Sequence, residues 1–405
     1  MATMMERIIE LNSVDQLAEY TSSWRELLAI TPHASFFQSV EWLAARWRNS
    51  GPDETLFVVV TTDGTCPTGF VPLCLKVEST SCGPMRVLRF PVDGWSSFYA
   101  PITADPETTL VNALHYLWRS KKNFDLIELI TMPAVDAGNR WHSVHADDPA
   151  STLEIAGQCC HESTRVAMLD LDGDWERYWE SRKEQKNRRR NVERCERRLQ
   201  ELGTVRYERY RPGGDLASDA EPRWDLYDAC EAIARASWQD GLVDGNTMHH
   251  DHVRPLLRDA HLAAVIAGAA DLNLLYLNDR PVAFVYGYHY QGYVDLMRVG
   301  FAPDLAKLAP GNALWTRLIQ DSFARGDRIL DFGPTCLDYK RFWTTRLEPS
   351  YQLIQYASSP KPQALRLARW LKSQRSVETD QSNQRSKELA SENRRADSLV
   401  IAVEG

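Results

Sequence analysis

Two patterns of apolar and polar positions each occur once in either half of this chain. Leu56 to Val77 and Leu272 to Tyr290 both read as an apolar strand, a polar turn and a second strand. Leu110 to Leu129 and Pro310 to Phe332 both read as a helical run that ends in a short apolar strand. Because the two patterns follow each other in the same order, the sequence predicts one αβ unit used twice.

Further segments complete the two units. Apolar residues recur at helical spacing between Trp24 and Trp47, which predicts helices ahead of the first hairpin. A polar stretch from Asp147 to Ser151 separates the halves. We therefore expect an α/β (α+β) fold of two tandem domains, each a mixed central sheet flanked by helices. The expected divisions are residues 1–165, residues 166–360, and residues 361–405 as a C-terminal helix and a polar tail.

A strongly basic helix is predicted at residues 182–202. Ser181 and Glu184 have capping-box spacing, and Gly203 is placed to end the helix. The basic residues of its outer face are Arg182, Lys183, Lys186, Arg188, Arg189, Arg190, Arg194, Arg197 and Arg198. Two interpretations stay open: a solvated helix, or a basic wall beside an anionic donor, an RNA or a polyanionic acceptor.

Composition narrows the class of protein. Hydrophobic residues make up 43% and charged residues 25% of the 405 positions, as in soluble globular proteins. A formal net charge of −8 argues against nucleic-acid binding by the chain as a whole. The eight cysteines form no Cys-x-x-Cys pair, and neither a secretory signal nor a long apolar run is present. We expect reduced thiols, no transmembrane segment and a cytoplasmic location.

The C-terminal region divides into two parts. Pro362 to Arg375 alternates Leu and Trp with Arg and Lys at helical spacing. This basic amphipathic helix is expected to pack back on the second domain, with peripheral contact to a membrane surface as the alternative. Residues 375–397 contain almost no apolar side chains and are predicted to be disordered.

The turn before the second helical run is the first candidate site. Pro310, Gly311, Asn312 and Ala313 lie between a strand and a helix, where free backbone N–H groups and the helix dipole suit a pyrophosphate. A plain turn with proline at the first helical position is the alternative. The first copy has Leu110-Val111 at the matching positions, which favours function in the second copy.

These residues resemble the acetyltransferases of the GNAT fold, and among them the tandem-domain CelD-type proteins of cellulose biosynthesis and their FemAB-like relatives. The resemblance covers about Phe36 to Trp343. It rests on these motifs: Phe37 to Trp42, the Arg-rich helix, Ser237-Trp238, Arg280-Pro281-Val282-Ala283-Phe284, Ala309-Pro310-Gly311, Asp331-Phe332-Gly333, Tyr339-Lys340 and Trp343.

The resemblance implies a donor and the residues that hold it. The donor would be acetyl-CoA or another acyl-CoA, with its pyrophosphate at Gly311 to Ala313 and its pantetheine arm along Met297, Arg298 and Val299. The family pattern is Arg/Gln-x-x-Gly-x-Gly/Ala. Gly311 and Ala313 fit it, but Leu308 replaces the first residue, so one side-chain contact to phosphate is missing and the adjacent Lys307 could replace it.

Acyl transfer to an amine also needs a base and an acid. Asp331 and His289 each end a predicted strand, so either could accept the proton of the amine; a turn residue and a surface histidine are the alternatives. Tyr339 and Lys340 could contact the thioester, the leaving group or the donor phosphates, or form a structural ion pair. We expect Asp331 before the others.

Two further groups are candidates for ligands. Ser237 and Trp238 close an amphipathic helix and could face the acceptor, although a core tryptophan is the alternative. The run His249 to His252 offers imidazoles without a second ligand cluster, so we expect no metal, and Asp251 is expected to cap a helix.

Three functions remain open from the sequence. The first is a GNAT-type acyltransferase, most directly an acetyltransferase, that acts on an amine or hydroxyl of a small molecule or sugar precursor, with exopolysaccharide or cell-envelope biosynthesis as one candidate setting. The second keeps the fold but takes aminoacyl-tRNA as donor, as FemAB-like relatives do, and is motivated by the basic helix. The third is a non-catalytic accessory protein of polysaccharide assembly. The sequence gives neither the acceptor nor the oligomeric state.

Overall fold

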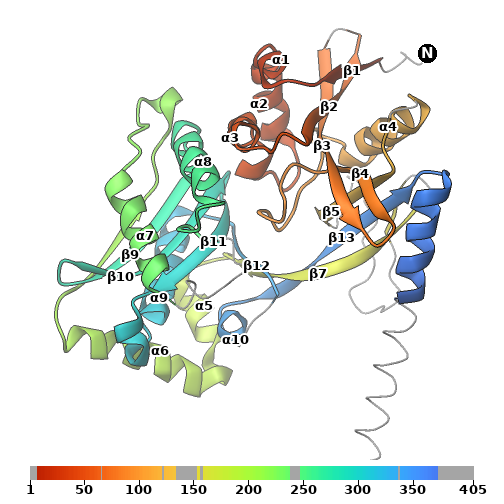
Figure 1. Cartoon of the computed structure of the whole chain (residues 1–405). Coiled ribbons are helices and arrows are strands. Elements are labelled where there is room, and N and C mark those ends of the chain that lie inside the picture. Colours follow the sequence, from red (N-terminus) through yellow and green to blue (C-terminus); the bar gives the residue numbers. More distant parts are fainter. Residues whose placement is uncertain are drawn as a thin grey trace, which may run out of the picture.

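The computed structural model describes residues 7–64, 66–120, 123–133, 153–155, 158–237, 247–335 and 338–372. The predicted fold class is confirmed: the chain has a mixed α/β architecture in which strands and helices of the two halves meet in one continuous sheet (Figure 1). The polar tail predicted at residues 375–397 lies outside the described residues. Among the described residues, no helix combines the length and the apolar character needed to cross a bilayer.

The first half contains the helices and hairpin that its apolar periodicity predicts. Its elements are β1 (Arg7–Leu11), α1 (Val14–Ala18), α2 (Thr21–Ile30), α3 (Val40–Arg48), β2 (Glu54–Asp63), β3 (Cys66–Thr80), β4 (Gly83–Arg89), α4 (Pro106–Arg119), β5 (Leu126–Pro133) and β6 (Leu153–Ile155). The predicted hairpin is the antiparallel pair β2 and β3. The second predicted pattern is α4 followed by β5.

The second half repeats this order after two added helices. Its elements are β7 (Gln158–Asp170), α5 (Trp175–Ser181), α6 (Lys186–Gln200), β8 (Val205–Tyr210), α7 (Trp224–Ala236), α8 (Arg254–Ile266), β9 (Ala270–Leu277), β10 (Arg280–Tyr290), β11 (Tyr293–Phe301), the 3-10 helix η5 (Pro303–Leu308), α9 (Pro310–Arg325), β12 (Ile329–Pro334), α10 (Asp338–Arg341) and β13 (Arg346–Tyr356). The hairpin of β9 and β10 matches that of β2 and β3, and α9 with β12 matches α4 with β5.

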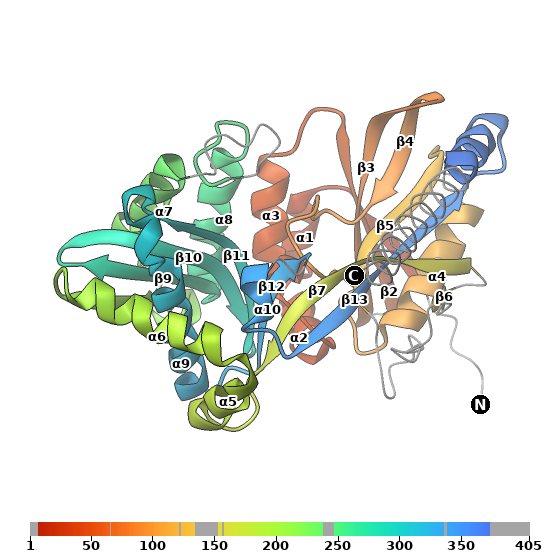
Figure 2. The ribbon, with the colours of Figure 1, turned by 90° about the horizontal axis from the view of Figure 1, so that it is seen from below.

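Two long strands join the halves into one sheet. The strand order is β1-β2-β3-β4-β5-β13-β7-β12-β11-β10-β9-β8. The last strand, β13, therefore lies between β5 of the first half and β7, antiparallel to both. Figure 2 shows β7 and β13 crossing from one half to the other. The division expected between residues 165 and 166 falls inside β7, so the halves are linked by sheet hydrogen bonds on both sides of that point.

Helices cover both faces of the sheet in the second half. One apolar layer packs α7 and α8 against Tyr286 and Tyr288 of β10. The other packs α6 and α9 against Val285 of β10 and Val294 of β11. Because side chains alternate between the faces of a strand, neighbouring residues of β10 serve different layers. Buried on both sides, this sheet is a rigid support for the residues at its strand ends.

The two repeated helices start differently. Helix α9 begins at Pro310, as expected, but α4 begins at Pro106, four positions before the Leu110 that matches Pro310 in the sequence alignment of the halves. The side chain of Asp105 accepts a hydrogen bond from the Thr108 N–H at the start of α4. Among the described residues, no side chain caps the start of α9. The carboxylate of Asp105 therefore caps the start of α4, whereas no described side chain caps the start of α9.

The C-terminal helix packs on the other half from the one expected. Residues 360–372 are helical, and Leu365 is buried among Met85, Val87 and Leu126 of β4 and β5. Arg369 contacts Glu128, which is also on β5. The expectation that this helix packs on the second domain is wrong. Because β13 leads the chain back to the first half, the helix that follows it begins there.

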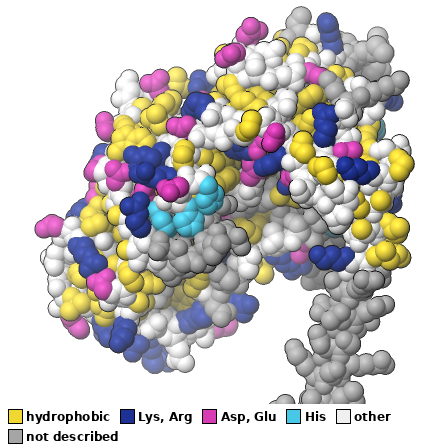
Figure 3. Space-filling view, viewed as in Figure 1, with side chains coloured by type: hydrophobic (Ala, Val, Ile, Leu, Met, Phe, Trp, Pro, Cys, Tyr) yellow, Lys and Arg dark blue, Asp and Glu magenta, His cyan; other side chains and the backbone are white. Residues whose placement is uncertain are grey.

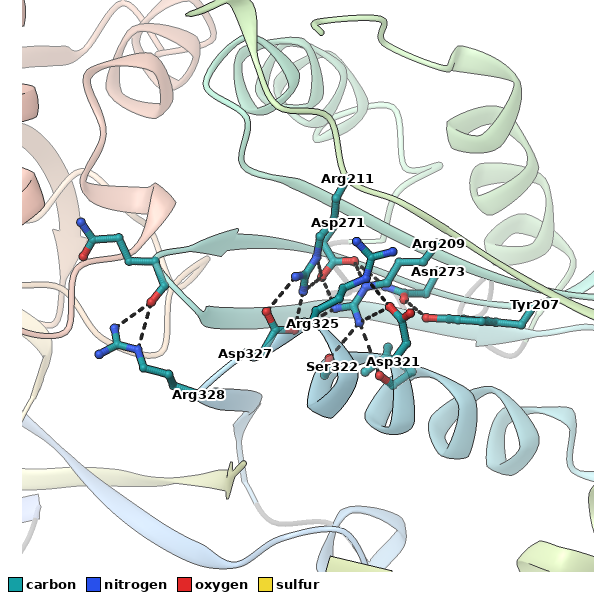
Figure 4. Close-up of polar contacts among 12 residues, drawn as sticks. Tyr207, Arg209, Arg211, Asp271, Asn273, Asp321, Ser322, Arg325, Asp327 and Arg328 are labelled. Carbon is teal, nitrogen blue, oxygen red and sulfur yellow. Dashed lines mark hydrogen bonds and ion pairs between the residues drawn. The ribbon is translucent and has the colours of Figure 1, made fainter. Parts of the chain in front are cut away.

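A buried ionic network ties β8, β9 and α9 together (Figure 4). Arg209 and Arg211 both donate to the carboxylate of Asp271, with N···O distances of 2.7 Å. Arg209 also reaches Asp321 at 3.0 Å, and Arg211 reaches Asp327 at 2.8 Å. The Asp271 side chain is fully buried. Although burial alone would raise the pKa of Asp271, the two guanidinium groups more than offset it and hold the pKa below its usual value.

We expect Asp271→Asn to destabilise the fold by about 3–5 kcal/mol, because two buried guanidinium groups would lose the charge that compensates them. Asp304→Asn removes an exposed pair with Arg280 and is the matched control, with an expected cost below about 1 kcal/mol. Urea unfolding followed by circular dichroism measures both. Equal midpoints for the two variants would contradict a structural role for this network.

Candidate active site

The candidate site lies where two parallel strands separate. β11 and β12 pair over three positions, Tyr293 with Ile329, Val294 with Leu330 and Asp295 with Asp331. β11 then continues to Phe301 and β12 to Pro334 without further pairing between them among the described residues. A cavity of about 190 Å³ opens there, lined by both strands and by the first-half loop Gly94 to Ser97. Both halves of the chain therefore form its walls.

Asp331 is the last residue of β12 that pairs with β11, and it is 1% exposed. Its Oδ1 accepts from the backbone N–H of Gly333 at 2.7 Å and from the Ser97 hydroxyl at 3.1 Å. Its Oδ2 accepts from the Tyr293 hydroxyl at 2.8 Å. These three donors fix the carboxylate at the cavity wall.

Asp295 is the residue opposite Asp331 on β11, and it is 5% exposed. Its Oδ2 atom is buried and has no hydrogen-bond partner among the described residues. A buried polar atom without a partner costs free energy unless a ligand or water satisfies it. Because Asp295 also lines the cavity, it is placed to meet a group that enters there.

Burial and mutual repulsion raise the pKa values of both carboxyl groups. Desolvation, followed by the charge of Asp331, raises the pKa of Asp295 well above its usual value. Desolvation also raises the pKa of Asp331, although hydrogen bonds from Gly333, Tyr293 and Ser97 and the nearby charge of Lys340 oppose the rise. Since two close carboxylates do not both ionise readily, Asp295 holds a proton more readily than Asp331. The pair thus offers one ionised and one protonated carboxyl group.

Tyr339 and Lys340 reach the same cavity from α10. The Lys340 side chain is buried, and its Nζ donates to the carbonyl of Pro334 at 3.2 Å. Tyr339 is 42% exposed, and desolvation raises its pKa above the usual value. The structure therefore places Asp331, Tyr339 and Lys340 at one cavity.

A bulge next to the pair shapes the strand. Between Tyr286 and Gly287 of β10 the register with β11 shifts by one residue, so that Met297 is left without a partner on β10. A β-carbon on Gly287 would overlap the carbonyl oxygen of Asp295. Only glycine lets the two backbones approach this closely.

The predicted donor turn opens into a second cavity. Ala309 is left-handed, with φ 49° and ψ 58°, and turns the chain from η5 into α9. Gly311 and Asn312 line a cavity of about 360 Å³, together with Phe301 of β11. A β-carbon on Gly311 would meet no atom within 4 Å. The start of α9 therefore borders open space at Gly311, while the Asn312 N–H donates to the carbonyl of Ala309 at 3.0 Å.

The two cavities meet along one side. Val299, Trp315 and Tyr339 line both of them. Met297 and Arg298 line the first cavity, while Pro310 and Ala313 are buried at the start of α9. A long donor that reached from the start of α9 to the carboxyl pair would pass these shared residues.

The predicted basic helix lies against the donor turn. α6 packs on α9 and η5, and Arg317 of α9 pairs with Glu196 of α6. The exposed cations of α6 are Lys186, Arg188, Arg190, Arg194, Arg197 and Arg198. Figure 3 shows basic side chains gathered along the lower edge of the molecule, where α6 lies in Figure 1. The helix places positive charge beside the second cavity.

Other predicted residues lie away from these cavities. His289 does not line either one; it sits beside Arg211, Asp271 and Asp327, and burial lowers its pKa to about 4. Ser237 ends α7 and donates to the carbonyl of Ala234, while Trp238 lies outside the described residues. In the part of the chain that the structure describes, no group of three His, Cys, Asp or Glu residues is arranged to hold a metal ion.

The sequence analysis did not predict that Asp295 and the loop residues Trp95 and Ser97 line the site. It also did not predict that the Arg298 side chain brings a positive charge to the cavity. One signal was present for Asp295, because it interrupts an otherwise apolar strand, and a buried acid in a strand is costly unless it has a role. No comparable signal marks Trp95 or Ser97. They reach the site only because the two halves share one sheet.

The second half matches the model of the acetyltransferase (GNAT) domain over residues 186–341. A search of the curated proteins found no match. Among solved structures, FemX superposes with a TM-score of 0.52 at 10% identity, covering 86% of this chain and 97% of FemX. The C-terminal domain of a putative lysylphosphatidylglycerol synthetase from Agrobacterium fabrum superposes with a TM-score of 0.50 at 11% identity, covering 89% and 97%. These likenesses show a shared fold.

We expect Gly287→Ala to lower stability by about 2 kcal/mol or more, because the added methyl group must push β11 away from β10 at Asp295. Gly51→Ala is the control, since nothing lies within 4 Å of its added carbon. Thermal unfolding of the two variants tests this expectation. A Gly287→Ala protein as stable as Gly51→Ala would show that the close approach of the strands is not required.

Proposed function

Because residues 186–341 match the model of the acetyltransferase (GNAT) domain, we propose that the protein is an acyltransferase, most directly an N-acetyltransferase, that moves an acyl group from acyl-CoA to an amine of a small molecule. The observation that carries the proposal is the joining of two cavities: one contains the start of α9 and the other contains Asp331. A sugar precursor of the cell envelope belongs to the same class of acceptor.

The start of α9 would hold the pyrophosphate of the donor. The helix dipole and the open backbone at Gly311 favour an anion, and among the described residues no side chain caps this helix start. The exposed Lys307 and the cations of α6 would supply the positive charge that the missing Arg or Gln at Leu308 does not. The pantetheine arm would then follow Met297 to Val299, where β11 has no partner on β12 among the described residues.

The reaction needs a neutral amine next to the thioester carbon. Asp331 would take a proton from the bound ammonium group. The amine nitrogen then attacks the carbonyl carbon, a C–N bond forms, the C–S bond breaks and the thiolate of coenzyme A leaves, while the nitrogen releases its second proton to solvent to give the neutral amide. Tyr339 or Lys340 would give the thiolate its proton, because both line the cavity beside Asp331. His289, which lies outside the cavity, has no part in this proposal.

Isothermal titration with acetyl-CoA tests the donor site. We expect binding to the wild-type protein and a loss of at least 10-fold in affinity for Gly311→Glu, because the new carboxylate would repel the diphosphate. Gly311→Ala is the matched control and should bind as the wild type does, since open space surrounds that position. Undiminished binding by Gly311→Glu would reject this location for the donor.

The pH dependence of kcat/KM tests Asp331. Its raised pKa means that the carboxyl group is protonated and inactive at low pH, so activity should appear as the pH rises through a value above the ordinary Asp range near 4. Asp331→Asn should lower kcat at least about 100-fold with acetyl-CoA affinity unchanged. Asp304→Asn should keep both the rate and the profile. Full activity of Asp331→Asn would remove its assigned role.

An aminoacyl-tRNA donor is the second candidate, and the exposed cations of α6 beside α9 are the observation that favours it. A polyanion bound there would lose affinity steeply with salt. Filter binding of aminoacyl-tRNA at 50 and 200 mM salt, with an α6 variant in which Arg190, Arg194 and Arg197 are changed to Gln, tests it. No binding at low salt would reject this donor. Absence of turnover with either donor would instead favour an accessory role.

A further inference from the structure

The bulge in β11 places two opposite charges on one face of the strand. In a regular strand, residues three apart point to opposite faces. Here Asp295 pairs with Tyr288 and Arg298 pairs with Tyr286, and both tyrosines pack in the same apolar layer. The extra residue, Met297, therefore turns Arg298 to the side of Asp295. The two residues that face them on β10, Tyr288 and Tyr286, are two positions apart. The Cα atoms of Asp295 and Arg298 therefore lie about 7 Å apart along the strand.

Both charges line the smaller cavity, and its other walls favour a compact ligand. The cavity measures about 190 Å³ and is closed on the first-half side by Gly94 to Ser97. Trp95 lies against the guanidinium group of Arg298, with 4.8 Å between the Arg298 carbon and the ring centre. This contact and a hydrogen bond of 2.7 Å from Nη1 to the carbonyl of Met297 hold the guanidinium group at the cavity wall.

The two ends of the cavity suit different chemical groups. The carboxyl pair Asp295 and Asp331 suits an amine, because Asp295 Oδ2 is buried without a partner among the described residues. Arg298 suits an anion, because a guanidinium group forms paired hydrogen bonds with a carboxylate. Desolvation lowers the pKa of Arg298 to about 10, and a bound anion would offset that cost.

We infer that the acceptor carries an acidic group as well as its amine, with the amine at Asp295 and Asp331 and the acidic group at Arg298. The acceptor class is then a free amino acid or a small compound with an amine and an acidic group a few bonds apart. This inference rests on the proposed acyltransferase function and narrows its acceptor. It gives Arg298 a role in acceptor recognition, in addition to the backbone contact with the donor that the resemblance implies.

The charges that face this pair come from several elements. Lys340 on α10 lies near Asp331 and would balance its negative charge when the cavity is empty. Asp331 Oδ1 accepts from both Ser97 and the Gly333 N–H, while Oδ2 accepts from Tyr293 alone and keeps a lone pair for an amine. An amine alone would contact only the carboxyl end of the cavity. An amino acid would contact both ends.

The test is acyl transfer from acetyl-CoA, followed by release of the coenzyme A thiol. The acceptors are the twenty common amino acids, the carboxamide and the decarboxylated amine of each one that reacts, phosphoethanolamine and glucosamine. We expect one or more amino acids to react and the matched decarboxylated amine to lose about 100-fold or more in kcat/KM. Phosphoethanolamine as the best acceptor would identify the acidic group as a phosphate rather than a carboxylate.

The Arg298→Gln variant separates recognition of the acidic group from the chemistry. It should lower kcat/KM for the acidic acceptor by about the same factor and lower kcat/KM for the decarboxylated amine far less, so that the preference for the acidic acceptor is lost. Arg280→Gln, which removes an exposed arginine of β10, is the control and should behave as the wild type does. If Arg298→Gln does not fold, Arg298→Lys and the comparison of acceptors on the wild-type protein give the answer.

Three results would overturn the inference. The first is equal use of an amino acid and its decarboxylated amine. The second is reaction of glucosamine but of no acceptor with an acidic group. The third is bound acetyl-CoA with no acidic acceptor used, which leaves the proposed acyltransferase function standing. Failure to bind acetyl-CoA at all would reject the proposed function, and this inference would fall with it.

Discussion

The separation of β11 from β12 after Asp295 and Asp331 is the constraint on which the site depends. Two neighbouring parallel strands normally continue side by side and satisfy each other's backbone groups. Here only three residue pairs are formed before the strands part. The last pair leaves two carboxyl groups side by side at the point of divergence, and the open edge of β11 follows directly. The divergence of the two strands therefore opens the cavity and places Asp295 beside Asp331. It also leaves the backbone of β11 beyond Asp295 without a pairing partner on β12 among the described residues.

Strand pairing on both sides keeps β11 and β12 apart beyond Asp295 and Asp331. On one side, the glycine at position 287 allows β10 to press against β11, and the resulting bulge turns Arg298 into the cavity. On the other side, β12 pairs with β7, whose register shifts between Asp331 and Pro334. β7 in turn pairs with β13, which continues into the first half. The first-half loop that carries Trp95 is thus fixed relative to the strands it faces.

Local patterns in the sequence were sufficient for the repeated units and for part of the site. The alternation of Leu272 to Tyr290 predicted the hairpin, and Pro310-Gly311 predicted the start of α9, because both features depend on neighbouring residues. Asp331 could be placed at a strand end for the same reason. His289 also ends a strand, but the sequence does not reveal at which end of the sheet it lies, and it falls beside Asp271 instead.

What could not be predicted depends on pairing between distant segments. The insertion of β13 between β5 and β7 joins residues far apart in the chain, and no periodicity within β13 specifies its neighbours. The C-terminal helix was assigned to the wrong half for that reason. Trp95 and Ser97 were missed because their partners, Arg298 and Asp331, are about two hundred positions away. The bulge was missed because it adds one residue to a strand whose apolar pattern looks regular.

The two copies of the repeated unit show why the chemistry would reside in only one of them. At the start of α4, Asp105 accepts from the Thr108 N–H, so a carboxylate of the protein already occupies the place where an anion would bind. At the start of α9, Ala309 provides no side-chain acceptor and Gly311 faces open space. A helix start that caps itself gains stability and excludes a diphosphate, whereas an uncapped start gives up that stability and remains able to bind one. The same αβ unit can therefore serve as a wall in the first half and as a donor site in the second.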